Sequence, residues 1–192
     1  MTPTIEIDHL TKRYGSTIAV DNLTLSVPKG SVCGLLGPNG AGKTTTFKCI
    51  LGLARSSSGT VRFDGLPLAA ETFERLTYVP EKSMLYEWMT GAEHLEVASR
   101  SYTRYDSARA AELTALFGLD LRKKVRTFSK GQRTALMLVL AFSTRPEILV
   151  LDEPASGLDP VHQRSVLDLI IDAAAGGATV IFSSHQITQV ER

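Results

Sequence analysis

Residues 37–45 read Gly37-Pro38-Asn39-Gly40-Ala41-Gly42-Lys43-Thr44-Thr45, and this stretch decides the fold. It fits the pattern G-x-x-x-x-G-K-[ST], a loop whose backbone N–H groups surround the phosphates of a nucleotide. The glycines let the main chain approach an anion closely. The Lys43 side chain can reach the β- and γ-phosphates, and the Thr44 hydroxyl is placed to ligate Mg²⁺. We therefore expect residues 37–45 to bind a nucleotide.

The segments on either side of this loop have the order that the motif requires. The apolar residues 32–36 are typical of a buried strand, and residues 45–53 are typical of a helix. The N-terminus of such a helix would point its dipole at the phosphates. Kinases, GTPases and molecular motors share this loop, so it leaves the kind of nucleotide-binding protein open.

The bulk composition is typical of one globular domain. The chain has 192 residues, of which 43% are hydrophobic and 21% are charged. Lys and Arg number 21 against 20 Asp and Glu, for a formal net charge of +1. This balance gives no support for a nucleic-acid partner or for direct binding to a membrane surface, and we expect neither.

Cysteine usage and hydropathy indicate a cytoplasmic protein. Cys33 and Cys49 both lie in apolar segments, so we expect two buried thiols in a reducing compartment, not a disulfide or a metal site. No segment approaches the ~20 apolar residues that cross a bilayer. Residues 1–14 lack the basic start and apolar block of a signal peptide. If the protein acts at a membrane, a partner must hold it there.

Strand and helix patterns alternate along the chain. Strand patterns occupy residues 4–8, 18–27, 31–36, 59–63, 76–79, 148–151 and 179–182. The block from 89 to 145 has helical spacing and no strand pattern, and residues 162–175 form another helical stretch that Gly176 and Gly177 end. This alternation predicts a parallel sheet with helical crossovers, interrupted by an inserted helical block.

Two carboxylates follow the apolar run 148–151. A strand this apolar is predicted to be buried on both faces, so its C-terminal acids would emerge at the sheet edge where α/β proteins bind ligands. Asp152 is placed to hold Mg²⁺ directly or through water, and Glu153 could accept a proton from an attacking water. The alternative is an ordinary solvated strand end.

The segment Ser129-Lys130-Gly131-Gln132-Arg133 decides between families. Together with the phosphate loop and the carboxylate pair, it makes the chain resemble the ATP-binding cassette (ABC) ATPases. That family has a Ser-Gly-Gly-Gln signature at the start of a helix, and here Lys130 replaces its first glycine. The resemblance implies that Ser129, Gly131 and Gln132 bind the ATP held by the other subunit of a head-to-tail dimer.

The resemblance implies roles for four further residues. Tyr14 would stack on adenine, Asp159 would link the two nucleotide sites across the dimer, and His185 would contact the γ-phosphate. The family usually has a glutamine after the strand that ends at residue 79, and here Glu81 stands in its place. A carboxylate there can still reach Mg²⁺ through water, and some drug-exporting members are similar in this respect.

Two clusters each leave two interpretations open. The basic run 122–126 is either a solvated helix end or a source of positive potential near the neighbouring subunit's phosphates. The aromatic cluster 86–89 is either core of the helical block or the place where a transporter helix docks.

The resemblance implies an α/β fold of the P-loop NTPase (RecA-like) type. Its parallel-sheet core and an N-terminal antiparallel β subdomain would occupy residues 1–88 and 146–192, and an inserted α-helical subdomain residues 89–145. Because family members normally continue well beyond His185, we expect the sequence to be truncated at its C-terminus.

The resemblance also implies a function. The chain would bind and hydrolyse ATP with Mg²⁺, as a homodimer or a heterodimer with a second ABC ATPase. It would drive the integral membrane permease of an exporter from the inner face of the cell membrane. The alternative is a soluble ABC ATPase that acts on DNA or ribosomes, which the spacing of Lys43 and Ser129 and the absence of heptads disfavour. A non-hydrolysing regulatory subunit is disfavoured because Glu153 is present.

Overall fold

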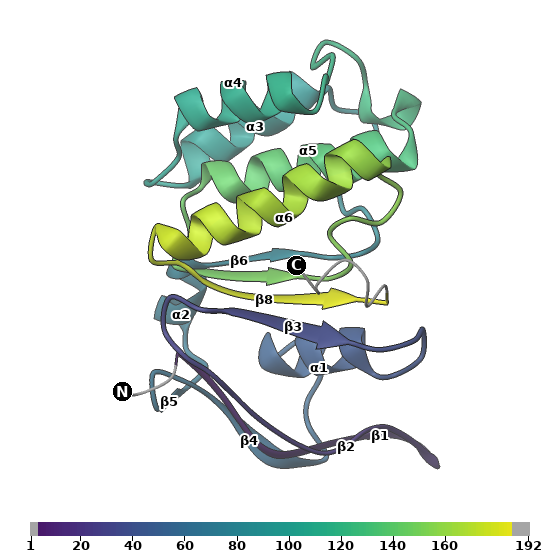
Figure 1. Ribbon diagram of the computed structural model, residues 1–192, viewed down its shortest axis with the longest axis vertical. Helices are drawn as coiled ribbons and strands as arrows, with labels where there is room; N and C mark the ends of the chain where they lie inside the picture. The colour runs from purple at the N-terminus through teal and green to yellow at the C-terminus, as the bar shows by residue number, and fades with distance from the viewer. Residues whose placement is uncertain (1–3, 186–192) are drawn as a thin grey trace.

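The computed structural model describes residues 4–185 and arranges them in layers (Figure 1). An antiparallel sheet lies at one end of the molecule and a parallel sheet lies in the middle. Helix α1 (Lys43–Ile50) lies between the two sheets, and α5 (Lys130–Ser143) and α6 (Pro160–Ala175) cover the other face of the parallel sheet. Helices α3 (Gly91–Ser101) and α4 (Ser107–Leu116) form the outermost layer, packed on α5. The structure is therefore α/β, as predicted.

The parallel sheet carries the phosphate loop. Its strands are β3 (Val32–Leu36), β6 (Leu76–Val79), β7 (Ile148–Leu151) and β8 (Thr179–Ser184), in the order β3-β8-β7-β6. All neighbouring strands run parallel, so the predicted parallel sheet with crossovers is confirmed. The carboxyl ends of β3, β7 and β8 therefore meet at one edge of the sheet.

The prediction that residues 32–36 form a buried strand is wrong in its burial. Strand β3 lies at the edge of the parallel sheet, next to β8, and its Val32 and Leu36 side chains remain 41% and 40% exposed. The central strand β7 is buried along its whole length, as predicted, because it has a neighbouring strand on each side and a packed layer on each face. An apolar run alone does not distinguish these two positions.

The antiparallel sheet has the order β2-β1-β4-β5, formed by β1 (Ile5–Tyr14), β2 (Thr17–Val27), β4 (Ser58–Phe63) and β5 (Leu66–Pro67). Strand β1 runs six residues beyond its predicted end at residue 8. The pairing of β1 shifts register after Ile7, and His9 adopts a φ of 49°. Such bulges break the two-residue alternation that sequence patterns detect.

The helices differ from expectation in three places. Helix α1 begins at Lys43 and ends at Ile50, earlier than the predicted 45–53, because Gly52 adopts a φ of 68° just beyond it. The short helix α2 (Ala70–Arg75) was not predicted. The basic run 122–126 is not a helix end: it lies in a turn and a 3₁₀ helix (Val125–Thr127) between α4 and α5. Helices α5 and α6 lie where helical spacing predicts them.

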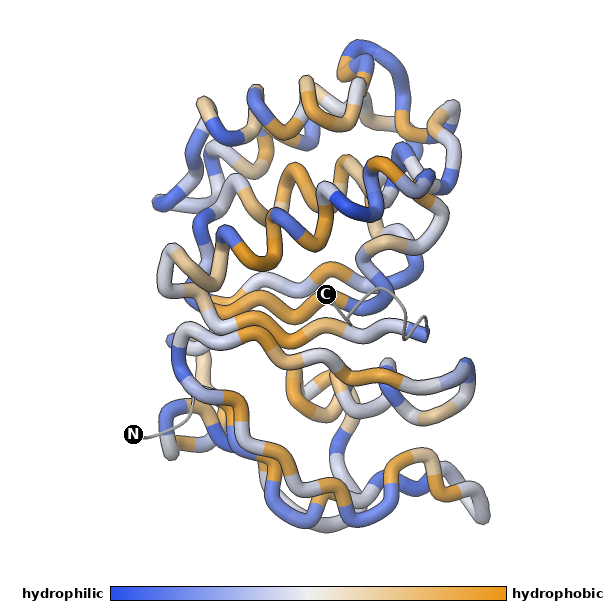
Figure 2. Tube along the Cα trace, in the orientation of Figure 1, coloured by the Kyte–Doolittle hydropathy of each residue, from blue (hydrophilic) through white to orange (hydrophobic). Residues whose placement is uncertain are grey.

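Two apolar cores hold the layers together, one on each face of the parallel sheet. Alternate residues of β7 enter each core: Ile148 and Val150 pack toward α1 and the antiparallel sheet, whereas Leu149 and Leu151 pack toward the helices. Figure 2 shows that hydrophobic residues are concentrated along the central strands. Burial on both faces fixes β7 firmly, so the residues that follow it have a defined position.

The cysteines and the hydropathy of the helices complete the description. Both cysteines are free; Cys49 is buried as predicted, but Cys33 on the edge strand is only partly buried. Burial raises the pKa of both thiols. Between residues 4 and 185, no helix is long and apolar enough to cross a membrane.

Candidate nucleotide-binding site

The phosphate loop is fixed by a close approach that only glycine permits. Gly42 caps α1 with a φ of 88°, and a Cβ there would lie 2.1 Å from the Ala19 carbonyl oxygen of β2. Its own carbonyl accepts a hydrogen bond from the Thr46 hydroxyl at 3.0 Å. The first N–H groups of α1 have no acceptor within the helix and carry the positive end of its dipole. The loop is therefore held in a form that favours an anion.

A cavity of about 290 Å³ opens above this loop. It brings together most of the residues that the sequence predicts to bind phosphates and metal, with one residue of β2. Its lining consists of Ala19, residues 39–45, Glu81 and Glu153. Gly37 and Pro38 do not line the cavity, but they position Lys43. Their carbonyl oxygens accept hydrogen bonds from Nζ of Lys43 at 2.6 and 3.1 Å.

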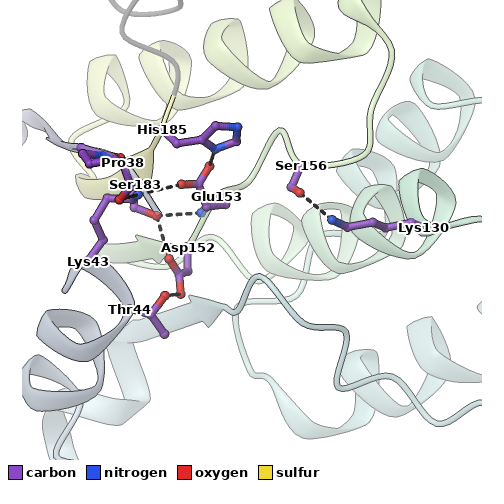
Figure 3. Close-up of polar contacts among 10 residues, drawn as sticks. Pro38, Lys43, Thr44, Lys130, Asp152, Glu153, Ser156, Ser183 and His185 are labelled. Atoms are coloured by element: carbon purple, nitrogen blue, oxygen red, sulfur yellow. Dashed lines mark hydrogen bonds and ion pairs between the residues drawn. The ribbon is translucent and has the colours of Figure 1, made fainter. Parts of the chain in front are cut away.

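Lys43 and Glu153 form a buried ion pair at the floor of the site. The Nζ of Lys43 lies 3.2 Å from Oε1 of Glu153, and the two side chains are 8% and 9% exposed. The other carboxylate oxygen, Oε2, lies 2.7 Å from Nδ1 of His185, which follows β8 directly (Figure 3). Apart from the ion pair, Oε1 has no hydrogen-bond partner in the described part of the chain. Glu153 therefore keeps one buried oxygen able to accept a proton.

Asp152 connects α1 to β8. Its Oδ2 accepts a hydrogen bond from the Thr44 hydroxyl at 2.7 Å, and its Oδ1 accepts one from the Ser183 hydroxyl at 2.7 Å. The Ser183 oxygen in turn accepts a hydrogen bond from the backbone N–H of Glu153 at 2.8 Å (Figure 3). Thr44 and Asp152, each predicted to hold Mg²⁺, thus lie in direct contact at the sheet edge.

Ser183 is a site residue that the sequence did not reveal. It lies at the end of β8, fully buried, and it joins the two carboxylate residues through one hydroxyl. Its position two residues before His185 was a usable signal, but Ser184 follows it immediately and is equally small and polar. Only the alternation of side chains along β8 decides which serine faces Asp152.

The backbone of Glu153 is strained. This residue has a φ of 50°, in the left-handed region that a side chain with a Cβ rarely occupies. Strain of this kind persists only where surrounding contacts hold it, and it is concentrated at functional sites. Here the Ser183 hydroxyl holds the N–H of Glu153, and the backbone N–H of Ser156 donates to its carbonyl at 2.9 Å.

Glu81 lies close enough to the site to act on it electrostatically. It lines the cavity, and it follows β6 as predicted. Burial, and then the negative charges of Asp152 and Glu81, raise the pKa of Tyr78 to about 12. Both carboxylates therefore lie close enough to the partly buried Tyr78 to raise its pKa.

The residues present fit a magnesium ion bound together with a nucleotide. Thr44 and Asp152 place two hard oxygen donors 2.7 Å apart at the phosphate loop. No group of three or more His, Cys, Asp or Glu side chains that could hold a metal by itself occurs within residues 4–185. Mg²⁺ typically takes only one or two protein carboxylates and completes its shell with phosphate oxygens and water, which matches this sparse donor set.

The signature residues lie away from this cavity. Ser129 and Gln132 form a reciprocal cap at the start of α5: the Ser129 hydroxyl accepts from the Gln132 N–H at 3.1 Å, and the Gln132 side chain accepts from the Ser129 N–H at 2.9 Å. Gly131 packs against the turn after Glu153, where a Cβ would lie 2.5 Å from the Gly157 carbonyl oxygen. Figure 3 shows Lys130 and Ser156 apart from the Lys43–Glu153 group.

Asp159 and Tyr14 also lie outside the cavity lining. Asp159 is the N-cap of α6, and its Oδ1 accepts hydrogen bonds from the Val161 and His162 N–H groups. The backbone N–H of His162, followed by its side chain, lowers the pKa of Asp159. Tyr14 lies at the end of β1, half exposed, with Nζ of Lys12 4.6 Å from its ring centroid. Roles for both residues toward a nucleotide stay predictions.

The two clusters with open interpretations differ in exposure. In the basic run, Arg122 is almost fully exposed and pairs with Asp120 at 3.0 Å, whereas Val125 is buried. In the aromatic cluster, Tyr86 and Trp88 are 61% and 68% exposed and their ring centroids lie 5.8 Å apart. Only Met89 of that cluster is core. Tyr86 and Trp88 are therefore not the core of the helical block.

Comparison with known proteins identifies the family of this chain. The family model described as ABC transporter matches residues 20–156. The chain is 38% identical over 192 residues to the uncharacterized ABC transporter ATP-binding protein YhaQ of Bacillus subtilis (strain 168), covering 97% of this chain and 64% of that protein. It is 34% identical over 194 residues to the bacitracin transport ATP-binding protein BcrA of Enterococcus faecalis, covering 98% and 63%. The chain therefore belongs to the ABC transporter family.

A solved structure supports the same assignment. The ATP binding subunit of an ABC transporter superposes with a TM-score of 0.86 at 32% identity, covering 98% of this chain and 82% of that chain. The fold is thus that of an ABC ATPase, a P-loop NTPase, as the resemblance implied. The family match gives no support to the non-transport alternative. The chain spans about two thirds or less of the length of several curated relatives, among them YhaQ and YtrB of Bacillus subtilis (strain 168).

Proposed function

We propose that the chain binds ATP and hydrolyses it as the nucleotide-binding subunit of an ABC transporter. The observation that carries this proposal is the group in which the buried Glu153 contacts Lys43 and His185 beside the Thr44–Asp152 pair. A phosphate loop alone would support nucleotide binding only. The additional buried carboxylate with an available oxygen supports hydrolysis.

Each residue of the group has a proposed role. Lys43 and the N-terminus of α1 bind the phosphates. Glu153 accepts a proton from the attacking water at Oε1, and Nδ1 of His185 fixes the orientation of that carboxylate through Oε2. Asp152 and Thr44 would hold Mg²⁺, with Glu81 reaching it through water. When bound, Mg²⁺ neutralises charge that develops on the phosphates.

We further propose that two copies, or this chain and a second ABC ATPase, close head to tail around two ATP molecules. The signature residues Ser129 and Gln132 and the helix cap Asp159 are all exposed, and none lines the cavity of its own chain. An exposed helix N-terminus with a capping hydroxyl suits an anion presented by another subunit. Tyr14 would stack on the adenine ring.

The proposed partner is an integral membrane permease, which would hold the chain at the inner face of the cell membrane. The exposed Tyr86 lines a largely apolar cavity of about 290 Å³ between the loop after β6 and helices α3 and α5, and the exposed Trp88 contacts Tyr86. Exposed aromatic side chains next to an apolar cavity are typical of a protein interface. The name of the Enterococcus relative, a bacitracin transport ATP-binding protein, favours an antibiotic-like solute, and we propose that the permease is that of an exporter.

The experiment that tests this function is phosphate release from ATP by the purified chain, with and without Mg²⁺. We expect Mg²⁺-dependent turnover that falls at least about a hundredfold in Glu153→Gln, while ATP binding persists and an ATP-bound dimer accumulates on gel filtration. The matched control is Glu112→Gln, because Glu112 is exposed and, within residues 4–185, forms an ion pair only with Arg109 on α4. Unchanged turnover in Glu153→Gln would overturn the mechanism.

A further inference from the structure

We propose that Lys130 is a positioning residue for Glu153 of its own chain, and this inference rests on the proposed function of Glu153 as the base. Lys130 stands where the resembled family has a glycine. It is the first residue of α5, and its Nζ donates a hydrogen bond to the Ser156 hydroxyl at 2.8 Å (Figure 3). Ser156 lies in the turn that follows Glu153. Helix α5, which carries the signature residues, therefore contacts the turn after Glu153 within one chain.

Four contacts hold this turn against the start of α5. Besides the Lys130–Ser156 bond, the Thr134 hydroxyl donates to the Ser156 carbonyl at 3.1 Å. Gly131 approaches Gly157 so closely that a Cβ would meet its carbonyl oxygen at 2.5 Å. The Lys130 stem covers Gly157, with Cγ and Cδ 3.0 and 3.1 Å from the place a Cβ would occupy there. A glycine at position 130 could supply neither the hydrogen bond nor this covering.

Backbone hydrogen bonds connect the contacts at Ser156 to Glu153. The Ser156 N–H donates to the Glu153 carbonyl at 2.9 Å, and the Ser183 hydroxyl holds the Glu153 N–H on the other side. Because Glu153 has a φ of 50°, its backbone needs support from both directions. If Ser156 shifts, the Glu153 carboxylate moves relative to Lys43 and His185, and small displacements of a reacting group reduce rate strongly.

Stability alone does not explain a lysine at this position. A cation at the first residue of a helix is opposed by the positive end of the helix dipole, and the first turn of α5 has no acidic residue. Lys130 makes no ion pair within residues 4–185, and its hydrogen-bond partner is a neutral hydroxyl. We therefore attribute the lysine at position 130 to its hydrogen bond with Ser156.

The kinetic test uses the full chain with four substitutions. Lys130→Met keeps the stem and removes Nζ, and Ser156→Ala removes the acceptor. We expect each to lower kcat for ATP about tenfold with KM unchanged, and the double variant to be no worse than either single one. Lys130→Arg and Ser156→Thr retain a donor and an acceptor and should restore most of the rate. A raised KM in Lys130→Met with full activity in Ser156→Ala would overturn the proposal, because the lysine would then bind nucleotide.

A second measurement separates this inference from the proposed function. Amide hydrogen exchange of the turn 153–157 requires no catalysis, and the Ser156 N–H bond to Glu153 lies within it. We expect faster exchange there in Lys130→Met and in Ser156→Ala, with exchange in the middle of α5 unchanged. Unchanged exchange in the turn would overturn the inference even if ATP hydrolysis is confirmed. If the chain does not hydrolyse ATP, the function fails while the exchange result still stands.

Discussion

The Nζ of Lys43 lies 3.2 Å from Oε1 of Glu153 in a site where both side chains are almost fully buried. The two partners are not equally dependent on each other. Lys43 also donates to the carbonyl oxygens of Gly37 and Pro38, whereas Oε1 has no other described partner. Removing the lysine therefore leaves a buried carboxylate oxygen without compensation, while removing the carboxylate leaves the lysine with two acceptors.

This asymmetry gives a prediction about stability. Lys43→Met should reduce the free energy of unfolding by about 3 kcal/mol, the usual loss when one member of a buried ion pair is removed. Glu153→Gln should cost less, because Lys43 keeps its carbonyl acceptors. The double variant should recover part of the Lys43→Met loss, since the unpaired charge is gone. Urea denaturation of all four proteins measures the cycle. Additive losses would show that the two groups do not interact in solution.

Much of this site could be predicted because its motifs follow strands. The phosphate loop after residue 36 and the carboxylates after residue 151 were assigned to one sheet edge, and the structure brings Thr44 and Asp152 into contact there. This works because the carboxyl ends of parallel strands meet at one edge, so order along the chain determines place in space. His185 was assigned from the family resemblance, and it also follows a strand of this sheet, β8.

The features that were mispredicted or missed depend on long-range packing, which sequence patterns do not reveal. The burial of residues 32–36 was overestimated, because an apolar run cannot distinguish an edge strand from a central one. Ser183 was missed because only register along β8 separates it from Ser184. The need for glycine at position 131 comes from its contact with Gly157, 26 residues away in sequence (157 − 131). These are long-range facts, and periodicity is local.

The contact between Gly131 and Gly157 gives a second prediction. Gly131→Ala should lower the free energy of unfolding by about 1–3 kcal/mol, because its Cβ would lie 2.5 Å from a backbone oxygen that cannot move freely. Gly176→Ala is the control, since Gly176 has a φ of −75° and its Cβ would lie no closer than 3.3 Å to any neighbour. Thermal or urea unfolding measures both. Equal stability of the two variants would show that the turn after Glu153 is not held against α5.

The cap of α6 gives a prediction about pH. Hydrogen bonds from His162 and Val161 lower the pKa of Asp159 in the folded protein below its ordinary value of 3.8. A group with a lowered folded pKa contributes stability above its unfolded pKa and loses it as the pH falls through the folded value. Asp159→Ala should therefore be less stable than the wild type near neutral pH, and the difference should shrink below pH 3.8.

Unfolding curves measured from neutral to acid pH check this prediction. Asp168→Ala, exposed on the same helix but away from its N-terminus, is the matched control and should show no such convergence. Asp159→Asn should keep most of the stability at neutral pH, because an amide oxygen also caps a helix. A stability difference for Asp159→Ala that stays constant into acid would mean that the carboxylate charge is not what caps α6.

Glu81→Gln separates nucleotide binding from hydrolysis. Glu81 lines the cavity but makes no part of the contacts that hold Lys43 or Asp152, so ATP affinity should change little in this variant. Removing its negative charge beside the phosphates should instead alter kcat, because a charge near the metal affects the stability of the transition state. ATP binding by equilibrium titration and phosphate release in the same preparation measure the two effects.

Tyr78 offers an independent readout: because Asp152 and Glu81 contribute to raising its pKa to about 12, its ultraviolet titration should move to lower pH in Glu81→Gln. Total loss of nucleotide binding in that variant would remove Glu81 from the metal side of the site and make it a structural residue of the loop after β6.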